Sequence, residues 1–372
     1  QLEQSSQYRD RMRQVEEFNA SSLTHLKGMA MSGIKFGISF TSKFLNQGNA
    51  LVNVYTDGSV QVSTGGTEMG QGLNTKIRQL VADEFGIGWR DVMLMTTSTE
   101  KNNNTSPTAA SAGTDLNGTA AVMACRQIRE RMAALAARVL SSPEGLSARD
   151  SSSGIVFADG RVFNADRTRS ILFGELCDLA RRERIDLGQR SFYATPGVDF
   201  DREAGRGNPY YYFTTGAAVA EVTIDRFTGD MTIDRVDLLM DVGNMINPGI
   251  DRGQVIGGFI QGMGWCTDED LVYDDQGRLL ATGPTTYKIP NITDVPGTFR
   301  VEFAENPKHK INVRLSKAVG EPPLMLGIAP WLAAKHAMSF IAADQIAELR
   351  VPATNEENLR CMTRLLAICS VS

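Results

Sequence analysis

The sequence predicts an α+β fold made of two related hairpin–loop–helix units. In the first unit, apolar and polar residues alternate at 49–64 around Asp57-Gly58, which is typical of a β-hairpin, and a glycine-rich loop leads into a helix. In the second unit, strand-like segments at 217–225 and 231–242 flank a turn and precede a loop and a helix. Because strands and helices do not alternate regularly, this class is favoured over a doubly wound sheet.

The first unit is expected at 1–150. It opens with polar, helix-like sequence, and the helix after the glycine-rich loop carries apolar residues at helical spacing, so that one stripe is buried. A further strand and a long helix rich in alanine, methionine and leucine complete the unit. These elements are expected at 65–72 for the loop, 73–85 for the helix, 91–98 for the strand and about 114–140 for the long helix.

The segment 151–209 is expected to hold a linker and connecting elements. The stretch SSPEGLSARDSSSG at 141–154 is the most linker-like, and IVFADGRVF after it is a second Asp-Gly hairpin. The second unit is expected at 210–372 and ends in helices. Pro322 and Pro323 belong to the opening turn of one of them, since proline disrupts a helix interior.

The composition argues against several classes of protein. The 38 basic and 43 acidic residues nearly balance without long runs of either sign, so nucleic acid or an anionic membrane is not the expected main partner. The five cysteines form no C-x-x-C pair and the three histidines lie far apart, so we expect a reducing, cytoplasmic location and no zinc or iron–sulfur ligation by this chain. No apolar stretch reaches the roughly 18 residues of a membrane span, and no signal peptide is visible. We interpret the start at Gln1 as a sign of a fragment or a processed product.

The loop GGTEMGQG at 65–72 invites comparison with phosphate-binding loops. Gly65 and Gly70 have the P-loop spacing, but Gln71 and Gly72 stand where that motif requires Lys and Ser or Thr, which argues against a nucleoside triphosphatase. The glycines do not follow G-x-G-x-x-G either. A flexible backbone at a helix N-terminus can hold an anionic or polar group, but a tight structural turn explains the same residues equally well.

Two further segments are poor in bulky side chains. In TSPTAASAGTD at 105–115, small residues either let a ligand approach the backbone or simply let the chain turn, and the local pattern favours the turn. The predicted helix GQVIGGFIQGMG at 253–264 contains glycines that each cost roughly 0.5–1 kcal/mol relative to alanine. Close packing against another helix or a large cofactor would offset that cost. Gln254 and Gln261 could be buried and donate to a cofactor, or be satisfied by the local backbone.

Glu321 lies between Gly320 and Pro322 in SKAVGEPPL. The following proline favours an extended backbone at Glu321, and the position before a helix places the carboxylate at the positive end of the helix dipole. A solvated acid that caps the helix is the usual explanation of such a residue. A positioned general base, kept ionised by the dipole, is the other. Glu68, beside the glycine-rich loop, is interpreted as a structural group.

Five segments occur in order: VYTDGSVQVSTGGTEMGQGLNTK, TSPTAASAGTDLNG, MDVGNMINPGIDRGQVIGGFIQGMG, GPTTYKIPN and SKAVGEPPL. Together they make the chain resemble the xanthine dehydrogenase branch of the molybdenum hydroxylases. The resemblance runs from about residue 5 to about residue 340 and matches the C-terminal half of the molybdenum-cofactor domain. It strengthens the ligand-binding interpretation of each segment.

This resemblance implies a molybdopterin–molybdenum centre with oxo and sulfido ligands, while Fe–S clusters, FAD and NAD are expected on other segments or chains. The family converts hypoxanthine and xanthine to urate with oxygen from water, and the electrons pass through Fe–S and FAD to NAD. Glu321 matches the catalytic base, which takes a proton from an oxygen on the metal. By motif match, Phe40 packs against the substrate, Thr41 contacts it, and the backbone of Ala110 approaches the metal. The matched cofactor-binding residues are Met69, Gly70, Gln71, Ala109, Ala110, Ser111 and Gln254.

The resemblance also implies partners. The chain lacks the preceding segment, which in the family supplies another glutamate, arginines and a second aromatic residue. We therefore expect it to act on a purine substrate together with the N-terminal half of the molybdenum domain and an Fe–S/FAD subunit, in a higher oligomer and without nucleic acid or membrane. Asn74 stands where relatives often carry histidine, a difference that we expect to matter little.

Two alternatives stay open. An aldehyde oxidase or another heteroaromatic molybdenum hydroxylase would share these motifs, although Thr41 and KAVGEPPL favour the xanthine enzyme. A non-catalytic cofactor-binding or assembly subunit would keep the fold and lose turnover. The intact Glu321, Gln71 and Gln254 argue against such a loss.

Overall fold

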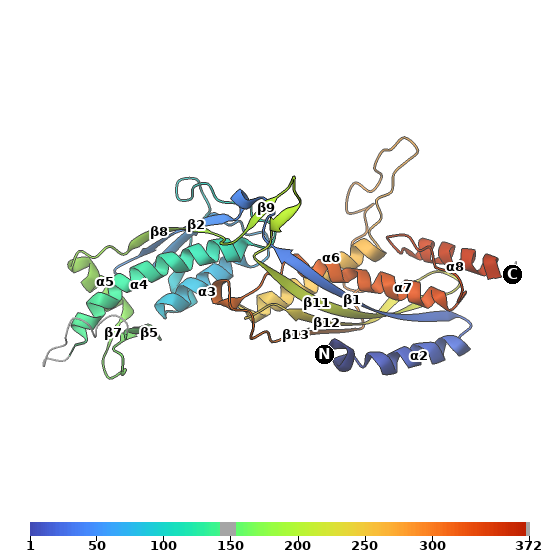
Figure 1. Ribbon diagram of the computed structural model, residues 1–372, viewed down its shortest axis with the longest axis horizontal. Helices are drawn as coiled ribbons and strands as arrows, with labels where there is room; N and C mark the ends of the chain where they lie inside the picture. Colours follow the sequence, from blue (N-terminus) through green and yellow to red (C-terminus); the bar gives the residue numbers. More distant parts are fainter. Residues whose placement is uncertain (142–153, 370–372) are drawn as a thin grey trace.

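The computed structural model describes residues 1–141 and 154–369. It is elongated and consists of two units, each built on its own four-stranded sheet. The two units follow one another end to end along the long axis (Figure 1). The predicted α+β class is confirmed. The linker predicted at 141–154 lies almost entirely outside the described residues.

The first unit is built on a sheet with the strand order β4-β3-β2-β8. β2 pairs with β3 and β8 in antiparallel fashion, and β3 pairs with β4 in parallel fashion. Helices α3 and α4 pack against this sheet and bury Val52, Ile77 and Ile128 completely. A three-stranded sheet and α5 lie at its far end (Figure 1). The bounds are β2 Gln47–Val54, β3 Val60–Thr64, β4 Val92–Leu94, β8 Gly188–Ala194, α3 Leu73–Phe85, α4 Thr119–Val139, β5 Val156–Ala158, β6 Arg161–Phe163, β7 Ser170–Leu172 and α5 Phe173–Arg182.

The second unit is built on a sheet with the strand order β1-β11-β12-β13. Helices α6 and α7 pack on one face of this sheet and α2 lies on the other (Figure 1). None of the helices in the described part of the chain has the length and apolar character of a membrane span. The bounds are α1 Leu2–Ser5, α2 Tyr8–Ser21, β1 His25–Ile38, β11 Tyr212–Asp225, β12 Met231–Asp241, α6 Pro248–Thr267, β13 Thr298–Phe303, α7 Ala329–Ser339 and α8 Asn355–Cys369. The short elements are η1 Lys43–Leu45, η2 Trp89–Asp91, the π-helical turn η3 Thr114–Gly118, β9 Asp199–Asp201, β10 Arg206–Asn208, η4 Val313–Leu315 and η5 Pro322–Ile328.

The predicted hairpins form. The β2–β3 loop lies around Asp57-Gly58 as predicted and is closed by the hydrogen bond from Tyr55 N to the Ser59 carbonyl at 2.9 Å, with Gly58 at a φ of 87°. The β5–β6 hairpin does have a two-residue turn, in which Asp159 and Gly160 have φ angles of 53° and 69°. The β11–β12 hairpin pairs as predicted. Both units therefore contain a hairpin, a loop and a helix in that order.

The predicted boundaries at 1–150, 151–209 and 210–372 do not follow the two sheets. β1 lies within the range expected for the first unit but pairs along its full length with β11, so it belongs to the second unit. β8 lies in the segment expected to be a linker with connections, yet it completes the first sheet beside β2. Both are pairings between strands far apart in the chain, which periodicity along the sequence does not reveal.

The glycines of α6 allow close helix packing, one of the two explanations predicted for them. A Cβ on Gly262 would lie 2.0 Å from the carbonyl oxygen of Leu324, and one on Gly327 would lie 2.2 Å from the carbonyl carbon of Gly262. The backbones of α6 and η5 therefore touch. Gly253 and Gly257 face open space instead. This contact fixes the start of η5 against α6.

Candidate functional site

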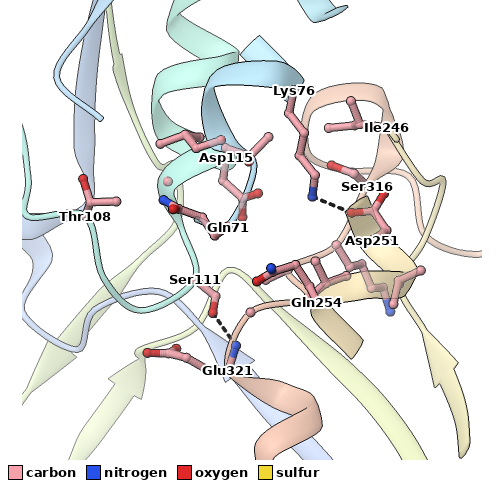
Figure 2. Close-up of a pocket in the computed structure, with 18 of the residues that line it drawn as sticks. Gln71, Lys76, Thr108, Ser111, Asp115, Ile246, Asp251, Gln254, Ser316 and Glu321 are labelled. Atoms are coloured by element: carbon pink, nitrogen blue, oxygen red, sulfur yellow. Dashed lines mark hydrogen bonds and ion pairs between the residues drawn. The ribbon is translucent and has the colours of Figure 1, made fainter. Parts of the chain in front are cut away.

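A cavity of about 350 Å³ lies where the two units meet. The first unit contributes the loop before α3 and the loop before η3, and the second unit contributes the start of α6 and the loop before η5 (Figure 2). The lining residues are Met69, Gln71, Leu73, Lys76, Thr108, Ala109, Ser111, Gly113, Thr114, Asp115, Val242, Asn244, Ile246, Asp251, Gln254, Ser316, Lys317, Ala318, Val319, Gly320 and Glu321.

Most of the predicted site residues lie on the wall of this cavity. Gly70 and Ala110 do not line it, but each lies in a loop between two residues that do. Phe40 and Thr41 lie outside the wall, directly after β1. Their functional roles remain predictions. The residues on the wall are Met69, Gln71, Ala109, Ser111, Gln254 and Glu321.

The glycine-rich loop is held in shape by Glu68. Its carboxylate accepts hydrogen bonds from the backbone N–H groups of Gly70, Gly72 and Asn74 at 2.9–3.0 Å. Burial alone would raise the pKa of Glu68, but these amides and that of Met69 outweigh it and lower the pKa below its ordinary value. The prediction that Glu68 is a structural group therefore agrees with its contacts, since it caps α3 and closes the loop.

Gln71 is fixed within the same loop. Its Oε1 accepts a hydrogen bond from Met69 N at 2.6 Å, and its Nε2 donates to the Thr67 carbonyl at 2.8 Å. The loop is tied to the next one because Thr67 N donates to Thr108 Oγ1 at 2.9 Å. The glycine-rich loop and the small-residue loop thus form one continuous wall of the cavity.

The small-residue loop has a strained backbone. Ala110 and Ser111 have φ angles of 53° and 51°, so two consecutive non-glycine residues are left-handed. Such residues cost of order 1–3 kcal/mol each, and they cluster at active sites and ligand clamps. The hydroxyl of Ser111 accepts a hydrogen bond from the backbone N–H of Glu321 at 2.8 Å, drawn as a dashed line in Figure 2. The first unit is thereby joined to the second at the residue predicted to act as a base.

Glu321 is the N-cap residue of η5, and its backbone differs from the prediction. Its φ of −85° and ψ of −38° are helical rather than extended. The proline that follows disfavours this conformation, but the turn of η5 and the hydrogen bond to Ser111 hold it. The carboxylate is exposed, makes no capping hydrogen bond, and has no hydrogen-bond or ion-pair partner among the described residues. The contacts of the described residues therefore do not support a capping role for this carboxylate.

Gln254 presents a second free group to the cavity. It lies on the second turn of α6, which Asn247 caps by accepting a hydrogen bond from Ile250 N at 3.1 Å. The Gln254 side chain is half-buried, and within residues 1–141 and 154–369 its amide has no hydrogen-bond partner. Gln261, for which burial beside Gln254 was one of the two interpretations of the sequence, is exposed. Of the two glutamines, only Gln254 can donate to a molecule in the cavity.

Phe40 and Thr41 are held by a rigid turn. The side chain of Asn46 makes two hydrogen bonds of 2.8 Å with the backbone of Phe40, one to its N–H and one to its carbonyl. Thr41 Oγ1 accepts a hydrogen bond from Arg202 at 3.4 Å. The turn after β1 therefore determines where these two side chains lie relative to the cavity.

The polar floor of the cavity was not predicted from the sequence. Lys76 forms an ion pair with Asp251 (Figure 2), and Lys317 Nζ lies 2.6 Å from Asp241 Oδ2. The side chains of both lysines are at most 9% exposed. Asp115 is also buried, and burial raises its pKa to about 6 although Tyr212, Asn312 and Lys76 favour its ionised form. Each of these groups finds its partner in a distant segment, so no local pattern marks it.

The residues present fit an organic cofactor that brings a metal with its own ligands. In the described part of the chain no three or more His, Cys, Asp or Glu side chains gather as a metal site. The cavity instead offers the Gln254 amide, the hydroxyl of Ser111 and the backbone of a loop without bulky side chains, which suit polar groups of a pterin. A Cβ on Gly70 would meet nothing within 4 Å, so the backbone there is open to a ligand.

Known proteins are similar to this chain in sequence and in fold. The family model described as a molybdopterin cofactor-binding domain matches residues 1–296. Xanthine dehydrogenase of Oryza sativa subsp. japonica is 43% identical over 352 residues, covering 93% of this chain and 24% of that protein. Xanthine dehydrogenase of Dictyostelium discoideum is 42% identical over 361 residues, covering 94% and 24%. The structure of quinoline 2-oxidoreductase from Pseudomonas putida 86 matches with a TM-score of 0.82 at 25% identity, covering 97% of this chain and 45% of that one. The chain spans about a quarter of the length of these curated relatives. It belongs to the molybdopterin cofactor-binding domain family.

Proposed function

We propose that this chain is the part of a molybdenum hydroxylase of the xanthine dehydrogenase type that supplies its general base, Glu321. The observation that carries the proposal is what meets at one cavity. There the strained small-residue loop lies beside the Glu321 carboxylate and the Gln254 amide, neither of which has a partner among residues 1–141 and 154–369. Ser111 and Glu321 are 210 residues apart in the chain, so the fold itself brings them together. A structural capping role would require none of these features.

The chain's own residues have distinct tasks in this proposal. The bound molybdopterin–molybdenum group supplies the redox chemistry. Gln254 and Gln71 bind its polar atoms through their amides, and Met69 and Gly70 enclose it. The backbone of Ala109, Ala110 and Ser111 admits it closely because the side chains of these residues are small. Glu321 takes up a proton at its carboxylate oxygen, and the hydrogen bond from its own N–H to Ser111 keeps it in place.

A purine, hypoxanthine or xanthine, is the proposed substrate, with Phe40 packing against its ring and Thr41 contacting it. The support is the name of the relatives that are 42–43% identical over most of this chain. The proposed electron path runs through Fe–S clusters and FAD to NAD on other segments. The N-terminal half of the molybdenum domain, an Fe–S/FAD subunit, an oligomeric assembly and a cytoplasmic location belong to the same proposal.

The test is Glu321→Gln in the complete holoenzyme. The amide keeps the shape of the side chain but cannot take up a proton, so kcat for xanthine should fall by about 10²–10⁴-fold. Glu305→Gln is the matched control, because Glu305 is an exposed glutamate outside the cavity wall, and its activity should stay normal. Molybdenum and pterin content should be unchanged in both. A Glu321→Gln enzyme with near-normal turnover and full cofactor would refute the proposal.

A second candidate function is hydroxylation of another heteroaromatic compound or an aldehyde. The observation that favours it is the TM-score of 0.82 with quinoline 2-oxidoreductase. Comparing kcat/KM of the holoenzyme for xanthine, quinoline and an aromatic aldehyde separates the candidates. The purine proposal requires xanthine to be the best of the three. A folded, assembled protein without molybdenum or pterin would instead favour a non-catalytic assembly subunit.

A further inference from the structure

A chain of buried hydrogen bonds runs beneath the loop that carries Glu321. The backbone N–H of Ala318 donates to Tyr212 Oη at 2.9 Å, and Tyr212 Oη donates to Asp115 Oδ2 at 2.7 Å. Asp115, Tyr212 and Ala318 are each only 5–6% exposed. Asp115 belongs to the π-helical turn that follows the small-residue loop, so this chain of hydrogen bonds joins that loop's helix to the loop before η5.

The other carboxylate oxygen of Asp115 reaches the same loop by a second route. Asp115 Oδ1 accepts a hydrogen bond from Asn312 Nδ2 at 2.8 Å, and the same amide group donates to the Ser316 carbonyl at 3.0 Å. Asp115 thus contacts both the Tyr212 hydroxyl, which binds Ala318, and the Asn312 amide, which binds Ser316. We call residues 316–321, which precede η5, the Glu321 loop. Through Tyr212 and Asn312, one buried carboxylate thus connects to both Ser316 and Ala318 at the start of this loop.

The surroundings add further fixed points to this loop. Thr214 Oγ1 donates to the Ala318 carbonyl at 3.1 Å, so Ala318 is held through both its N–H and its carbonyl. Lys317 Nζ donates to the Phe213 carbonyl at 3.0 Å and pairs with Asp241. Ser316, Lys317 and Ala318 are therefore all anchored. These contacts fix the position from which the Glu321 N–H reaches Ser111 Oγ.

A buried carboxylate at this place is not explained by stability. Burial raises the pKa of Asp115 to about 6, which means that the site disfavours the charge there. An apolar side chain of similar size would avoid this cost, but it could not accept the hydrogen bonds from Tyr212 and Asn312. The π-helical turn that carries Asp115 is itself a rare feature, found frequently at functional sites.

We infer that Asp115 is a positioning residue. It acts through Tyr212 to hold the Glu321 loop in a fixed position relative to the small-residue loop. This role rests on the proposed function only in assigning proton uptake to Glu321. The positioning itself is a property of the fold. Loss of the chain of hydrogen bonds should loosen residues 316–321 and misplace the carboxylate. A misplacement of about 1 Å can lower a catalytic rate by about 10²-fold.

The first test is Tyr212→Phe in the complete holoenzyme, with Tyr211→Phe as the matched control. Each variant loses one hydroxyl, but only Tyr212 accepts from Ala318 and donates to Asp115. Hydrogen–deuterium exchange of a peptide covering 316–321 should become at least roughly tenfold faster in Tyr212→Phe and stay unchanged in Tyr211→Phe. In steady-state assays kcat should fall by tenfold or more in the first variant, with KM and cofactor content unchanged.

The second test uses Asp115 directly, in case Tyr212→Phe does not fold. Asp115→Asn keeps an oxygen that can accept the hydrogen bond from Tyr212 Oη, and it gives up only the hydrogen bond from Asn312 Nδ2, which faces the other carboxylate oxygen. It should therefore retain most of the slow exchange and of kcat, while Asp115→Ala should lose both. Equal exchange in wild type, Tyr212→Phe and Asp115→Ala would overturn the inference. If Glu321→Gln were fully active while these exchange differences remained, the proposed function would fail and the positioning role would stand.

Discussion

The contact between α6 and η5 makes a quantitative prediction through Gly262→Ala. The added methyl group would lie 2.0 Å from the Leu324 carbonyl oxygen, whereas real Cβ contacts are essentially never shorter than 3.0 Å. The two backbones must therefore separate by about 1 Å, and such overpacking typically costs about 1–3 kcal/mol. Gly257→Ala on the same helix is the matched control, because its methyl group would meet nothing within 4 Å.

Both substitutions gain the same helix propensity, about 1 kcal/mol for alanine over glycine, so that gain cancels in the comparison. Urea unfolding of the chain, followed by circular dichroism, should show Gly257→Ala more stable than wild type. Gly262→Ala should be about 1–3 kcal/mol less stable than Gly257→Ala. In the holoenzyme, Gly262→Ala should also lower kcat, since Glu321 is the N-cap residue of η5 and would move with it. Equal stability of the two variants would refute the packing argument.

Three further predictions concern the cavity. Lys317→Met should lower the free energy of unfolding by about 3–5 kcal/mol, measured by urea titration, because the buried Asp241 carboxylate loses its cationic partner and keeps only the hydrogen bonds from Asn306 and Gly243; a loss below about 1 kcal/mol would contradict this. Asp115→Asn should flatten the pH dependence of stability between pH 4 and 6. Folding raises the pKa of Asp115 from 3.8 to about 6, so the folded chain binds this proton more tightly than the unfolded chain. The resulting contribution to the free energy of unfolding, about 3 kcal/mol, is present at low pH and is lost as the pH rises through 6. An identical pH profile in Asp115→Asn would exclude this assignment. Gln254→Ala should speed pterin loss from the holoenzyme during dialysis and leave the unfolding midpoint unchanged; unchanged retention would remove Gln254 from the cofactor site.

The local elements could be predicted because each has a local cause. Alternation of residues marked the strands of the hairpins, helical spacing marked α3, and Pro322 and Pro323 marked the opening turn of η5. The loops that line the cavity were visible as stretches poor in bulky side chains. Glu321 was visible as a candidate, although its residue pattern alone fitted a capping acid, and its ordered place among the other motifs raised the base interpretation.

The parts that could not be predicted depend on contacts between distant segments. β1 pairs with β11, and Ile38 lies opposite Tyr212. In the sequence, β11 follows β1 only after all four strands of the first sheet. The unit to which β1 belongs could therefore not be predicted from its neighbours in the sequence. Asp115 looked like one more residue at a helix start, because its partners Tyr212 and Asn312 come from elsewhere. Helical geometry at Glu321 was also missed, since the hydrogen bond from its N–H to Ser111 outweighs the preference imposed by the following proline.

The most direct test of Glu321 as the base is a single-turnover measurement. The oxidised holoenzyme and its Glu321→Gln variant are mixed with xanthine without an electron acceptor, and reduction is followed by absorbance. With equal molybdenum and pterin content, the variant should be reduced at least about 10²-fold more slowly than wild type. Reduction of the variant at the wild-type rate would contradict the assignment of proton uptake to Glu321.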